Sequence, residues 1–470
     1  MPMLTHTRTK VVCTIGPASA TPDALRALMT AGLDVARINF SHGTHEEHAS
    51  RIADIRRIAD ELNRPVAILG DLQGPRIRVG HLDAPITLED GSEVTLVHED
   101  LARPGDLPVT YDHIAQDVHV GARILLDDGL LALDVLAIDG PRVRCTVVYG
   151  GVLKSHKGMN LPGVQVSAPT LTEKDLVDIQ FAIKYELDYL ALSFVRRPAD
   201  MDTLRALVPK GMLLIAKIEK DSALEAIEDI LKASDAVMVA RGDLGVELPF
   251  ELVPIAQKRI IALANRYGRP VITATQMLES MIENPRPTRA EASDVANAIF
   301  DGTDAVMLSA ETAAGSYPRL AVEAMVRIAA EAERHPVARG VGADRVEAGR
   351  ASIEETIAGA TVTAVRLLGA AAVVVFSKSG FSARIVAARR PGVPIIAFTD
   401  QERTYRQLAM VWGVTPVRVP HSETYEQMAS HAREAVVDMG IAKPGDRIVL
   451  TAGVPFDVPG TTNTLKVETV

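Results

Sequence analysis

The sequence predicts an α/β fold: a (β/α)8 TIM barrel with an inserted small all-β domain and a C-terminal α/β domain. Two observations carry this prediction. Short β-branched runs alternate with amphipathic stretches over most of the chain, and the alternation is interrupted once, after the third run. Three strands before the interruption and five after it give the eight β/α units of a barrel.

The first part of the barrel is expected over residues 1–73. Thr21 and Pro22 are typical of the start of a helix, and Gly32 is typical of its end. A second helix is predicted over 44–62. The three strands are predicted at 11–15, 35–39 and 66–69.

Residues 74–168 interrupt the barrel. Here the chain consists of short alternating runs separated by Gly, Pro and Asp, such as those at 86–88, 94–97, 123–126 and 143–148. Strands at this spacing, with turn residues between them, indicate a small all-β barrel or sandwich. We expect this inserted β domain to form a lid over the barrel.

The second part of the barrel is expected over residues 169–340. Its strands are predicted at 189–192, 213–218, 236–240, 271–274 and 305–308. An open doubly wound sheet is the alternative arrangement of the same units. No Gly-x-Gly-x-x-Gly fingerprint follows any of these strands, which counts against a dinucleotide-binding fold.

Residues 347–470 are expected to form a separate α/β domain. Its helices are predicted at 353–368 and 382–390, and its strands at 371–376, 393–398, 414–419 and 447–450.

Composition excludes several classes of partner. The 470-residue chain has a net charge of −10, whereas a nucleic-acid-binding surface needs a basic face. Cys13 and Cys145 are too few for a disulfide framework, which indicates a reducing compartment. Residues 1–10 lack the apolar core of a signal peptide, and the longest apolar run, 367–376, is too short to span a bilayer. We therefore expect a soluble cytoplasmic protein with no nucleic-acid or membrane partner.

Polar residues follow the predicted strands at the end where barrel enzymes carry out chemistry. Loops after strands are usually polar, so any one of these residues is ordinary, but similar residues after seven strands are harder to dismiss. They are Arg37, Asn39, Ser41, His42, Asp71, Ser193, Lys217, Glu219, Arg241, Asp243, Thr275, Ser309 and Glu311.

Lys217 and Glu219 end the predicted fifth strand, and their spacing of two places both side chains on one face. An ordinary Lys–Glu ion pair is one interpretation. Against it, a Lys and a Glu inside a barrel are costly to bury without a ligand or metal. Glu219 and Asp243, on neighbouring strands, offer two carboxylates for Mg²⁺, which keeps most of its water. No His or Cys ligand set accompanies them, which argues against zinc.

Gly242 lies beside Asp243 and allows backbone amides to approach an anionic substrate, although a turn glycine would look the same. Arg37, Arg78 and Lys157 are cations that can lie near the same mouth. A magnesium ion with several fixed cations is what phosphoryl transfer requires.

Eight segments together resemble motifs of the pyruvate kinases, over nearly the whole chain. They are 13–19 (CTIGPAS), 36–43 (ARINFSHG), 157–163 (KGMNLPG), 216–219 (AKIE), 240–245 (ARGDLG), 274–281 (ATQMLESM), 284–291 (NPRPTRAE) and 307–312 (MLSAET). The family fold is a barrel with a β domain inserted after the third strand and a C-terminal α/β domain. The resemblance implies conversion of phosphoenolpyruvate and ADP to pyruvate and ATP, with Mg²⁺ or Mn²⁺ as cofactor, by a homotetramer.

The resemblance also implies roles for single residues. By motif position, Lys217 would stabilise the phosphoryl group in transfer, and Glu219 and Asp243 would hold the divalent metal. Thr275 and Ser309 are candidates for relaying the proton that converts the enolate to pyruvate. The implied substrate contacts are Arg37, Lys217, Gly242, Asp243 and Thr275. The implied nucleotide side consists of Asn39, Phe40, Ser41, His42, Arg78 and Lys157.

The chain departs from potassium-dependent members after the third strand. Those members typically have Asp-Thr-Lys-Gly-Pro-Glu, whereas residues 71–76 are Asp-Leu-Gln-Gly-Pro-Arg. Members with Lys at the position of Arg76 are usually potassium-independent, because the side-chain cation replaces the ion. Since Arg76 carries the same charge, we predict that K⁺ is dispensable. The alternative is a surface Arg76 with an intact ion site at Asn39, Ser41, Asp71 and Leu72.

A segment of the C-terminal domain has the residue types of a phosphate cradle at a helix N-terminus, although an ordinary capped turn is the alternative. Its residues are Ser377, Lys378, Ser379, Gly380 and Ser382. In the family this position holds the phosphate of an allosteric sugar. The loop 453–460 lacks the Trp and Arg typical of fructose-bisphosphate-activated members, so we expect a sugar or nucleotide monophosphate as the effector.

Two other functions fit part of the pattern. A metal-dependent barrel aldolase or lyase would share Glu219 and Asp243 but has no need for Lys217, Lys157 or the inserted domain. A non-catalytic sensor with only the effector site has no need to keep the set of Lys217, Glu219, Asp243 and Thr275.

Overall fold

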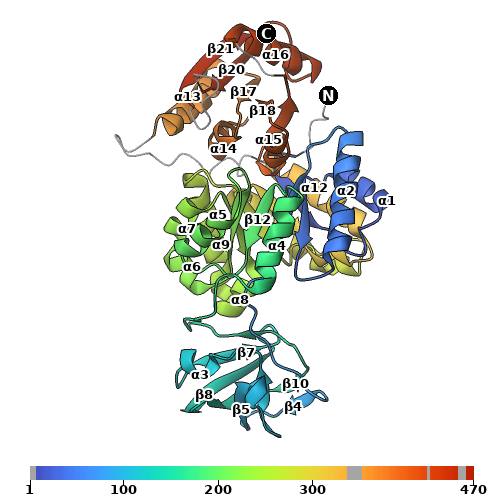
Figure 1. Cartoon of the computed structure of the whole chain (residues 1–470). Helices are drawn as coiled ribbons and strands as arrows, with labels where there is room; N and C mark the ends of the chain where they lie inside the picture. Colours follow the sequence, from blue (N-terminus) through green and yellow to red (C-terminus); the bar gives the residue numbers. More distant parts are fainter. Residues whose placement is uncertain (1–6, 336–351, 421–423, 454–461) are drawn as a thin grey trace.

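The computed structural model describes residues 7–335, 352–420, 424–453 and 462–470. Its domains form an elongated stack (Figure 1). The C-terminal domain lies at one end, the barrel in the middle and the inserted β domain at the other end, joined to the barrel by a narrow connection.

Eight parallel strands close into the barrel. They are β1 (Lys10–Thr14), β2 (Val35–Asn39), β3 (Ala67–Asp71), β12 (Tyr189–Leu192), β13 (Leu213–Ile218), β14 (Ala236–Ala240), β15 (Val271–Ala274) and β16 (Ala305–Leu308). Around the barrel they follow the order β1-β16-β15-β14-β13-β12-β3-β2. The predicted (β/α)8 barrel is confirmed and the open doubly wound sheet is excluded. Six strands have the predicted bounds, and the ends of β1 and β3 differ from prediction by one or two residues.

The barrel strands are apolar on both faces, as parallel strands covered by helices must be. In β13, Leu214, Ala216 and Ile218 pack outward in the helix-covered core, whereas Ile215 packs in the barrel interior. This alternation decides which polar residues reach the interior at the strand ends.

Helices surround the barrel, and capping boxes begin three of them, at Thr44, Thr172 and Thr288. The helices are α1 (Pro22–Ala31), α2 (His45–Glu61), α4 (Glu173–Lys184), α5 (Pro198–Leu207), α6 (Asp221–Glu225), α7 (Ile227–Ala233), α8 (Arg241–Glu247), α9 (Val253–Arg266), α10 (Arg289–Asp301), α11 (Ala310–Ala313) and α12 (Pro318–Arg334), with 3₁₀ turns η2 (Phe250–Leu252) and η3 (Glu279–Ile282).

The inserted β domain follows β3 and therefore lies at the carboxyl end of the barrel. Its elements are β4 (Ile86–Leu88), β5 (Glu93–His98), η1 (Glu99–Leu101), β6 (Leu107–Val109), α3 (Ile114–Asp117), β7 (Arg123–Leu126), β8 (Leu131–Asp139), β9 (Arg142–Tyr149), β10 (Gly151–Leu153) and β11 (Met159–Asn160). A six-stranded sheet runs β11-β7-β8-β9-β5-β6, and β10 pairs with β4. Its own apolar core holds it together.

The C-terminal domain is a five-stranded sheet in the order β19-β18-β17-β20-β21 with helices on both faces. Its elements are α13 (Ile353–Leu368), β17 (Ala372–Phe376), α14 (Phe381–Ala388), β18 (Ile395–Thr399), α15 (Glu402–Gln407), η5 (Leu408–Met410), β19 (Val414–Arg418), α16 (Tyr425–Asp438), β20 (Arg447–Ala452) and β21 (Thr464–Thr469). The antiparallel strand β21 was not predicted, because its largely exposed sequence lacks an apolar run.

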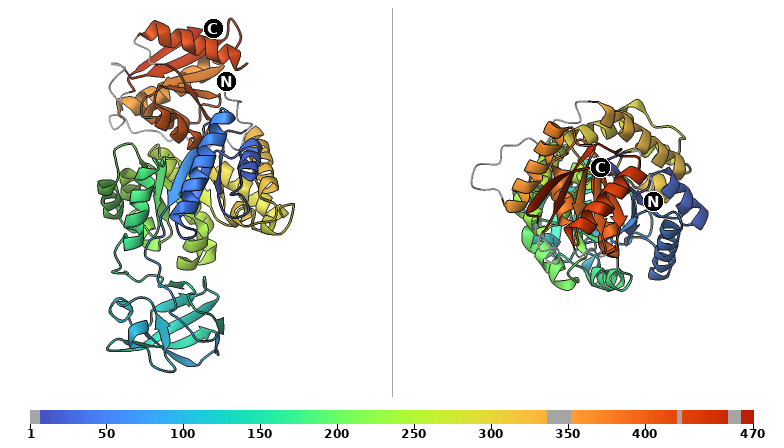
Figure 2. Two further views of the ribbon diagram at one scale, coloured as in Figure 1. Left: turned by 45° about the vertical axis from the view of Figure 1, so that its right-hand side comes forward. Right: turned by 90° about the horizontal axis from the view of Figure 1, so that it is seen from above.

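The C-terminal domain closes the amino end of the barrel, as the view along the stack shows (Figure 2). Ala409 and Met410 pack in the same apolar cluster as the barrel interior. Tyr189 donates a hydrogen bond from its hydroxyl to the Gln407 carbonyl (2.7 Å), and Lys10 Nζ donates to the Val414 carbonyl (2.9 Å). Only the carboxyl end of the barrel remains for a ligand.

None of the described helices combines the length and the apolar character that a membrane span requires.

Candidate active site

The apolar interior of the barrel ends in a polar layer at the carboxyl ends of the strands. In β13 the inward alternation of Ile215 continues to Lys217 and Glu219. The same alternation turns Arg37 of β2 and Asp71 of β3 inward. All four of these side chains are charged and buried, so their charges must be compensated by one another or by a ligand.

Lys217 lies at the centre of this layer. Its Nζ lies 2.8 Å from Glu219 Oε1 and 3.4 Å from Asp71 Oδ1, and it donates a hydrogen bond of 2.8 Å to Ser193 Oγ. Asp71 is shared with Arg37, whose Nε donates to Asp71 Oδ2 at 2.7 Å. The structure thus brings together residues of four adjacent strands, β2, β3, β12 and β13.

The charges in this layer control each other's protonation. Burial alone would lower the pKa of Lys217, but the carboxylates of Asp71 and Glu219 outweigh it and raise that pKa. Burial would raise the pKa of Asp71, yet Lys217 and Arg37 lower it. Burial raises the pKa of Glu219, and the nearby charge of Asp243 raises it further against the opposing effect of Lys217. Lys217 is therefore held as a cation, and Glu219 lacks sufficient positive charge around it.

Glu219 and Asp243 have the properties of a site for a hard divalent cation. Glu219 Oε2 accepts a hydrogen bond from the Phe194 amide (2.7 Å), which fixes the carboxylate, and Oε1 is buried without a hydrogen bond of normal geometry from the described residues. Asp243 is partly exposed on α8 and lines the neighbouring cleft. Within the described ranges no group of three or more His, Cys, Asp or Glu residues forms a complete metal cage. Two carboxylates completed by water and substrate oxygens fit Mg²⁺ or Mn²⁺.

Thr275 follows β15 with its backbone in the left-handed region (φ 67°). Its hydroxyl accepts a hydrogen bond from the Gly242 amide (2.8 Å) and donates to the Ala274 carbonyl (2.7 Å). A β-carbon added at Gly242 would lie 3.4 Å from this hydroxyl. The start of α8 therefore lies directly against the Thr275 side chain. The predicted substrate residues Gly242, Asp243 and Thr275 therefore lie together.

Ser309 follows β16 with a buried hydroxyl that has no partner among the described residues. Glu311, fully buried, accepts hydrogen bonds from the amides of Ser309 (2.7 Å) and Leu278 (3.1 Å) and so fixes the two adjoining loops. The Ser309 hydroxyl remains available to a ligand.

A cavity of about 250 Å³ lies between the mouth of the barrel and the inserted β domain. Arg76, Arg78, Lys157, Arg196 and Lys220 line it together with Asp243. Lys157 Nζ pairs with Asp127 (2.7 Å) and stays partly exposed. This concentration of cations suits the phosphates of a nucleotide.

The predicted nucleotide residues 39–42 do not line this cleft. The Phe40 ring is buried against His48 and Phe181. The residue is 1% exposed, its amide donates to the Asp71 carbonyl (3.0 Å) and its carbonyl accepts a hydrogen bond from Lys174 Nζ (2.6 Å), so Phe40 belongs to the core. Ser41 is partly exposed, with its amide bonded to Asn39 Oδ1 (3.1 Å), and His42 is exposed.

Comparison with known proteins identifies the family. Residues 6–322 match the family model "Pyruvate kinase, barrel domain", and residues 355–468 match "Pyruvate kinase, alpha/beta domain". The chain belongs to the pyruvate kinase family.

Individual relatives agree with this assignment. A pyruvate kinase of Geobacillus stearothermophilus is 49% identical over 471 residues, covering 98% of this chain and 80% of the relative. One from Staphylococcus aureus (strain MRSA252) is 47% identical over 470 residues, with the same coverage. The crystal structure of a pyruvate kinase from Cryptosporidium parvum superimposes with a TM-score of 0.92 at 35% identity, covering 99% of this chain and 96% of that one.

The residues that distinguish potassium-dependent family members occupy different environments. Arg76 is exposed, lines the cleft and makes no hydrogen bond or ion pair within the described residues. Leu72 is buried, and its carbonyl accepts a hydrogen bond from Ser193 (2.8 Å). The cationic partners of Asp71 are Arg37 and Lys217, and not Arg76.

The predicted effector segment lies between β17 and α14. Gly380 takes a left-handed conformation (φ 74°) as the N-cap of α14, and Ser377 and Ser379 are partly exposed. The Ser382 hydroxyl is instead buried in a hydrogen bond with Thr462 (2.6 Å), and the Lys378 carbonyl accepts one from Thr404 (2.6 Å). In the loop 453–460, only Gly453 belongs to the described residues.

Several contacts of the site were not predicted. Thr14 accepts a hydrogen bond from Arg37 Nη1 (2.8 Å), the Phe194 amide holds Glu219, and Lys220 pairs with Glu247. Phe194 has φ 56°, a conformation that its residue type does not signal. The same strand-end reasoning could have reached Lys220, one residue beyond Glu219, and Thr14, the last residue of β1.

We predict that the Asp71→Asn variant loses stability in a pH-dependent way. The pKa of Asp71 is lowered in the folded protein, so its stabilisation is complete above the unfolded value of about 4 and is lost as the pH falls through the folded value. At neutral pH the variant leaves Arg37 and Lys217 without their shared carboxylate, a loss on the order of 3 kcal/mol in the free energy of unfolding. Calorimetric melting between pH 7 and pH 3, as approximate limits, measures this difference, which should shrink on the acid side.

The exposed Asp202 of α5 provides the control, because an Asp202→Asn change should leave the melting temperature close to that of the wild type at every pH. A constant difference between wild type and Asp71→Asn across the pH range would contradict the ion-pair account.

Proposed function

We propose that this chain is a pyruvate kinase that transfers the phosphoryl group of phosphoenolpyruvate to ADP, giving pyruvate and ATP. The observation that carries the proposal is the buried Lys217, held as a cation between Asp71 and Glu219 at the only open end of the barrel. Membership of the pyruvate kinase family supports the same reaction.

Lys217 supplies the charge that phosphoryl transfer needs. As the phosphoryl group moves, negative charge spreads over its equatorial oxygens, and a pre-positioned cation in a water-poor site stabilises it without reorganisation. Ser193 and Asp71 fix the ammonium in place, and Arg37 next to them contributes a second cation for the substrate carboxylate or phosphate.

Glu219 and Asp243 would hold the divalent cation, Mg²⁺ or Mn²⁺. When bound, this ion supplies positive charge that polarises the phosphate and neutralises the two carboxylates. The raised pKa of Glu219 supports this assignment, and so does the buried Oε1, whose contact with Lys217 Nζ (2.8 Å) lacks the geometry of a normal hydrogen bond.

Thr275 and Ser309 are our candidates for the proton relay to the enolate. Both hydroxyls lie at carboxyl ends of adjacent strands, and that of Ser309 has no partner among the described residues. A neutral hydroxyl must pass on a proton that it receives from water or from another group, so we assign these residues the transfer of the proton and not its origin.

The nucleotide would lie in the cation-lined cleft, where Arg78 and Lys157 of the inserted β domain are found. Asn39 to His42 do not line this cleft in the structure, and they form the second group of nucleotide-binding candidates. Closure of the inserted domain over the barrel would bring both groups of residues to the same ligand and exclude water.

The test is turnover of the wild type and of Lys217→Met. Wild type should form pyruvate from phosphoenolpyruvate with ADP and Mg²⁺, measured by NADH oxidation in a coupled lactate dehydrogenase assay. Lys217→Met should lower kcat by roughly 10³-fold, because it removes the central charge stabilising the transition state. Circular dichroism checks that the variant is folded.

The control variant is Lys232→Met, which removes an exposed Lys–Asp pair on α7 and should leave kcat unchanged. Release of pyruvate without ADP would instead favour a lyase, and binding without turnover would favour a non-catalytic sensor.

We further propose that potassium is dispensable. Asp71 already has two cationic partners, and Arg76 adds a positive charge to the lining of the cleft. In potassium-free buffer with tetramethylammonium as the counter-ion, the rate should stay within about twofold of the rate with potassium, while Arg76→Glu should make it potassium-dependent. A large activation of the wild type by potassium would refute this assignment.

Allosteric regulation by a phosphorylated small molecule is the remaining part of the proposal. Partly exposed Ser377 and Ser379 beside the N-cap Gly380 support a phosphate site on the C-terminal domain. In isothermal titration with a panel of sugar and nucleotide monophosphates, at least one should bind, and the Ser377→Ala/Ser379→Ala double variant should weaken its affinity about tenfold. Equal affinity in the double variant would place the effector elsewhere.

A further inference from the structure

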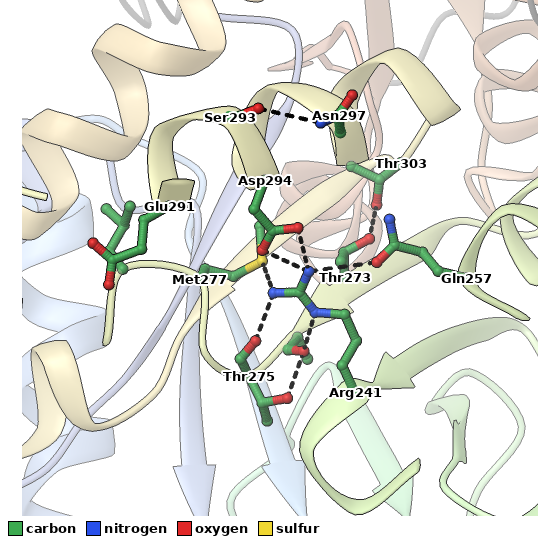
Figure 3. Close-up of polar contacts among 12 residues, drawn as sticks. Arg241, Gln257, Thr273, Thr275, Met277, Glu291, Ser293, Asp294, Asn297 and Thr303 are labelled. Atoms are coloured by element: carbon green, nitrogen blue, oxygen red, sulfur yellow. Dashed lines mark hydrogen bonds and ion pairs between the residues drawn. The ribbon is translucent and has the colours of Figure 1, made fainter. Parts of the chain in front are cut away.

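Arg241 is the first residue of α8 and belongs to the segment that also supplies Gly242 and Asp243, yet it does not line the cation-rich cleft between the barrel and the inserted β domain. Figure 3 shows its guanidinium turned between the end of β15 and the helix α10. Nη1 bonds both oxygens of Asp294 (2.8 and 2.7 Å), and Nη2 donates to the Thr275 carbonyl (2.7 Å). Nε donates to the Ala274 carbonyl at 3.3 Å.

The backbone that Arg241 contacts is strained. Thr275 and Gln276 both lie in the left-handed region, with φ values of 67° and 53°. For a β-branched residue such as Thr275 this conformation is a clear outlier, and it persists only where surrounding contacts enforce it. Two successive residues of this kind need a specific restraint.

Arg241 and Gly242 together provide that restraint. The Arg241 guanidinium bonds the carbonyls on both sides of the Thr275 α-carbon, and the Gly242 amide bonds the Thr275 hydroxyl. The planar guanidinium with its several donors can satisfy both carbonyls and Asp294 at once, which a lysine cannot. Asp294, on α10, anchors the guanidinium from the opposite side.

We propose that Arg241 is a positioning residue of the reaction: it locks the left-handed turn at Thr275 and thereby fixes the Thr275 hydroxyl beside Gly242 and Asp243. Arg241 acts only through Thr275. The inference builds on the proposed function, since it assigns Thr275 to the reacting end of the site.

The kinetic test is a double-mutant cycle between Arg241 and Thr275. Arg241→Gln should lower kcat about 10- to 100-fold, because a catalytic hydroxyl displaced by about 1 Å loses that much. The KM for ADP should stay within about twofold, since Arg241 does not line the cleft proposed for the nucleotide. In the Thr275→Ala background, assayed at higher enzyme concentration, Arg241→Gln should have almost no further effect. Arg241→Lys should recover part of the loss.

Two variants separate positioning from general stability. Arg205→Gln removes an equivalent pair at the amino end of the barrel, where Arg205 bonds Asp235 (2.6 Å) and the Ala233 carbonyl (3.2 Å), and should leave kcat unchanged. Asp294→Asn keeps Arg241 but weakens its anchor, and should give a smaller loss of kcat, about two- to fivefold, that also vanishes without Thr275. If Arg241→Gln does not fold, Asp294→Asn tests the positioning role in its place.

A crystal structure of Arg241→Gln tests the clamp independently of any activity. We expect Thr275 to leave the left-handed region and its hydroxyl to lose the Gly242 amide. An unchanged turn, or equal fold-losses of kcat with and without the Thr275 hydroxyl, would overturn the proposal. Absence of phosphoenolpyruvate turnover in the wild type would instead overturn the proposed function, and the crystal structure would still decide the clamp.

Discussion

The burial of one positive charge, that of Lys217, determines the organisation of the site. Only 7% of this residue is exposed, and a lone ammonium at that depth would lose its proton or destabilise the fold. Asp71, Ser193 and Glu219 prevent this, and they come from the ends of β3, β12 and β13, which are neighbours in the barrel. The charge is therefore tolerated only because the barrel closes in this strand order, and Arg37 on β2 extends the same network by one strand.

The amino end of the barrel is instead closed by the C-terminal domain. There the interior is filled mostly by apolar atoms, with Ala409 and Met410 of the C-terminal domain packed among the inward residues of the strands, and the buried Lys10 Nζ donates to the Val414 carbonyl. Charged groups at this interface pair at its margin, such as Arg390 with Asp304 (3.0 Å), while the Arg390 guanidinium stacks over Trp412 (4.4 Å). One end of the barrel is thus closed by the C-terminal domain, and the polar layer lies at the end where the inserted β domain meets the barrel.

The sequence predicted the features that depend on regular periodicity. The alternation of side chains along β13 alone placed Lys217 and Glu219 on one face of the strand. The count of eight strands placed these residues at the carboxyl mouth of a barrel, and both predictions agree with the structure. Contacts made by irregular backbone were not predictable. The Phe194 amide reaches Glu219 only because Phe194 has a positive φ, and the Phe40 ring lies in the core although its neighbours Ser41 and His42 are more exposed. Such features depend on tertiary packing that the residue types do not reveal.

The charged groups at the open end are divided between the barrel and the inserted β domain. The mouth of the barrel holds Asp71, Glu219 and Asp243 against Arg37 and Lys217, so this layer alone is left with an excess of negative charge, which the proposed divalent cation would offset. Most of the cations suited to a nucleotide line the cleft, and Arg78 and Lys157 are carried by the inserted β domain. A phosphate-bearing ligand bridging the two would screen the repulsion among these cations, so ligand binding and approach of the β domain favour each other. Placing the cations on a separate domain keeps them solvated until the ligand arrives, whereas Lys217, on the rigid barrel, remains desolvated and in position throughout.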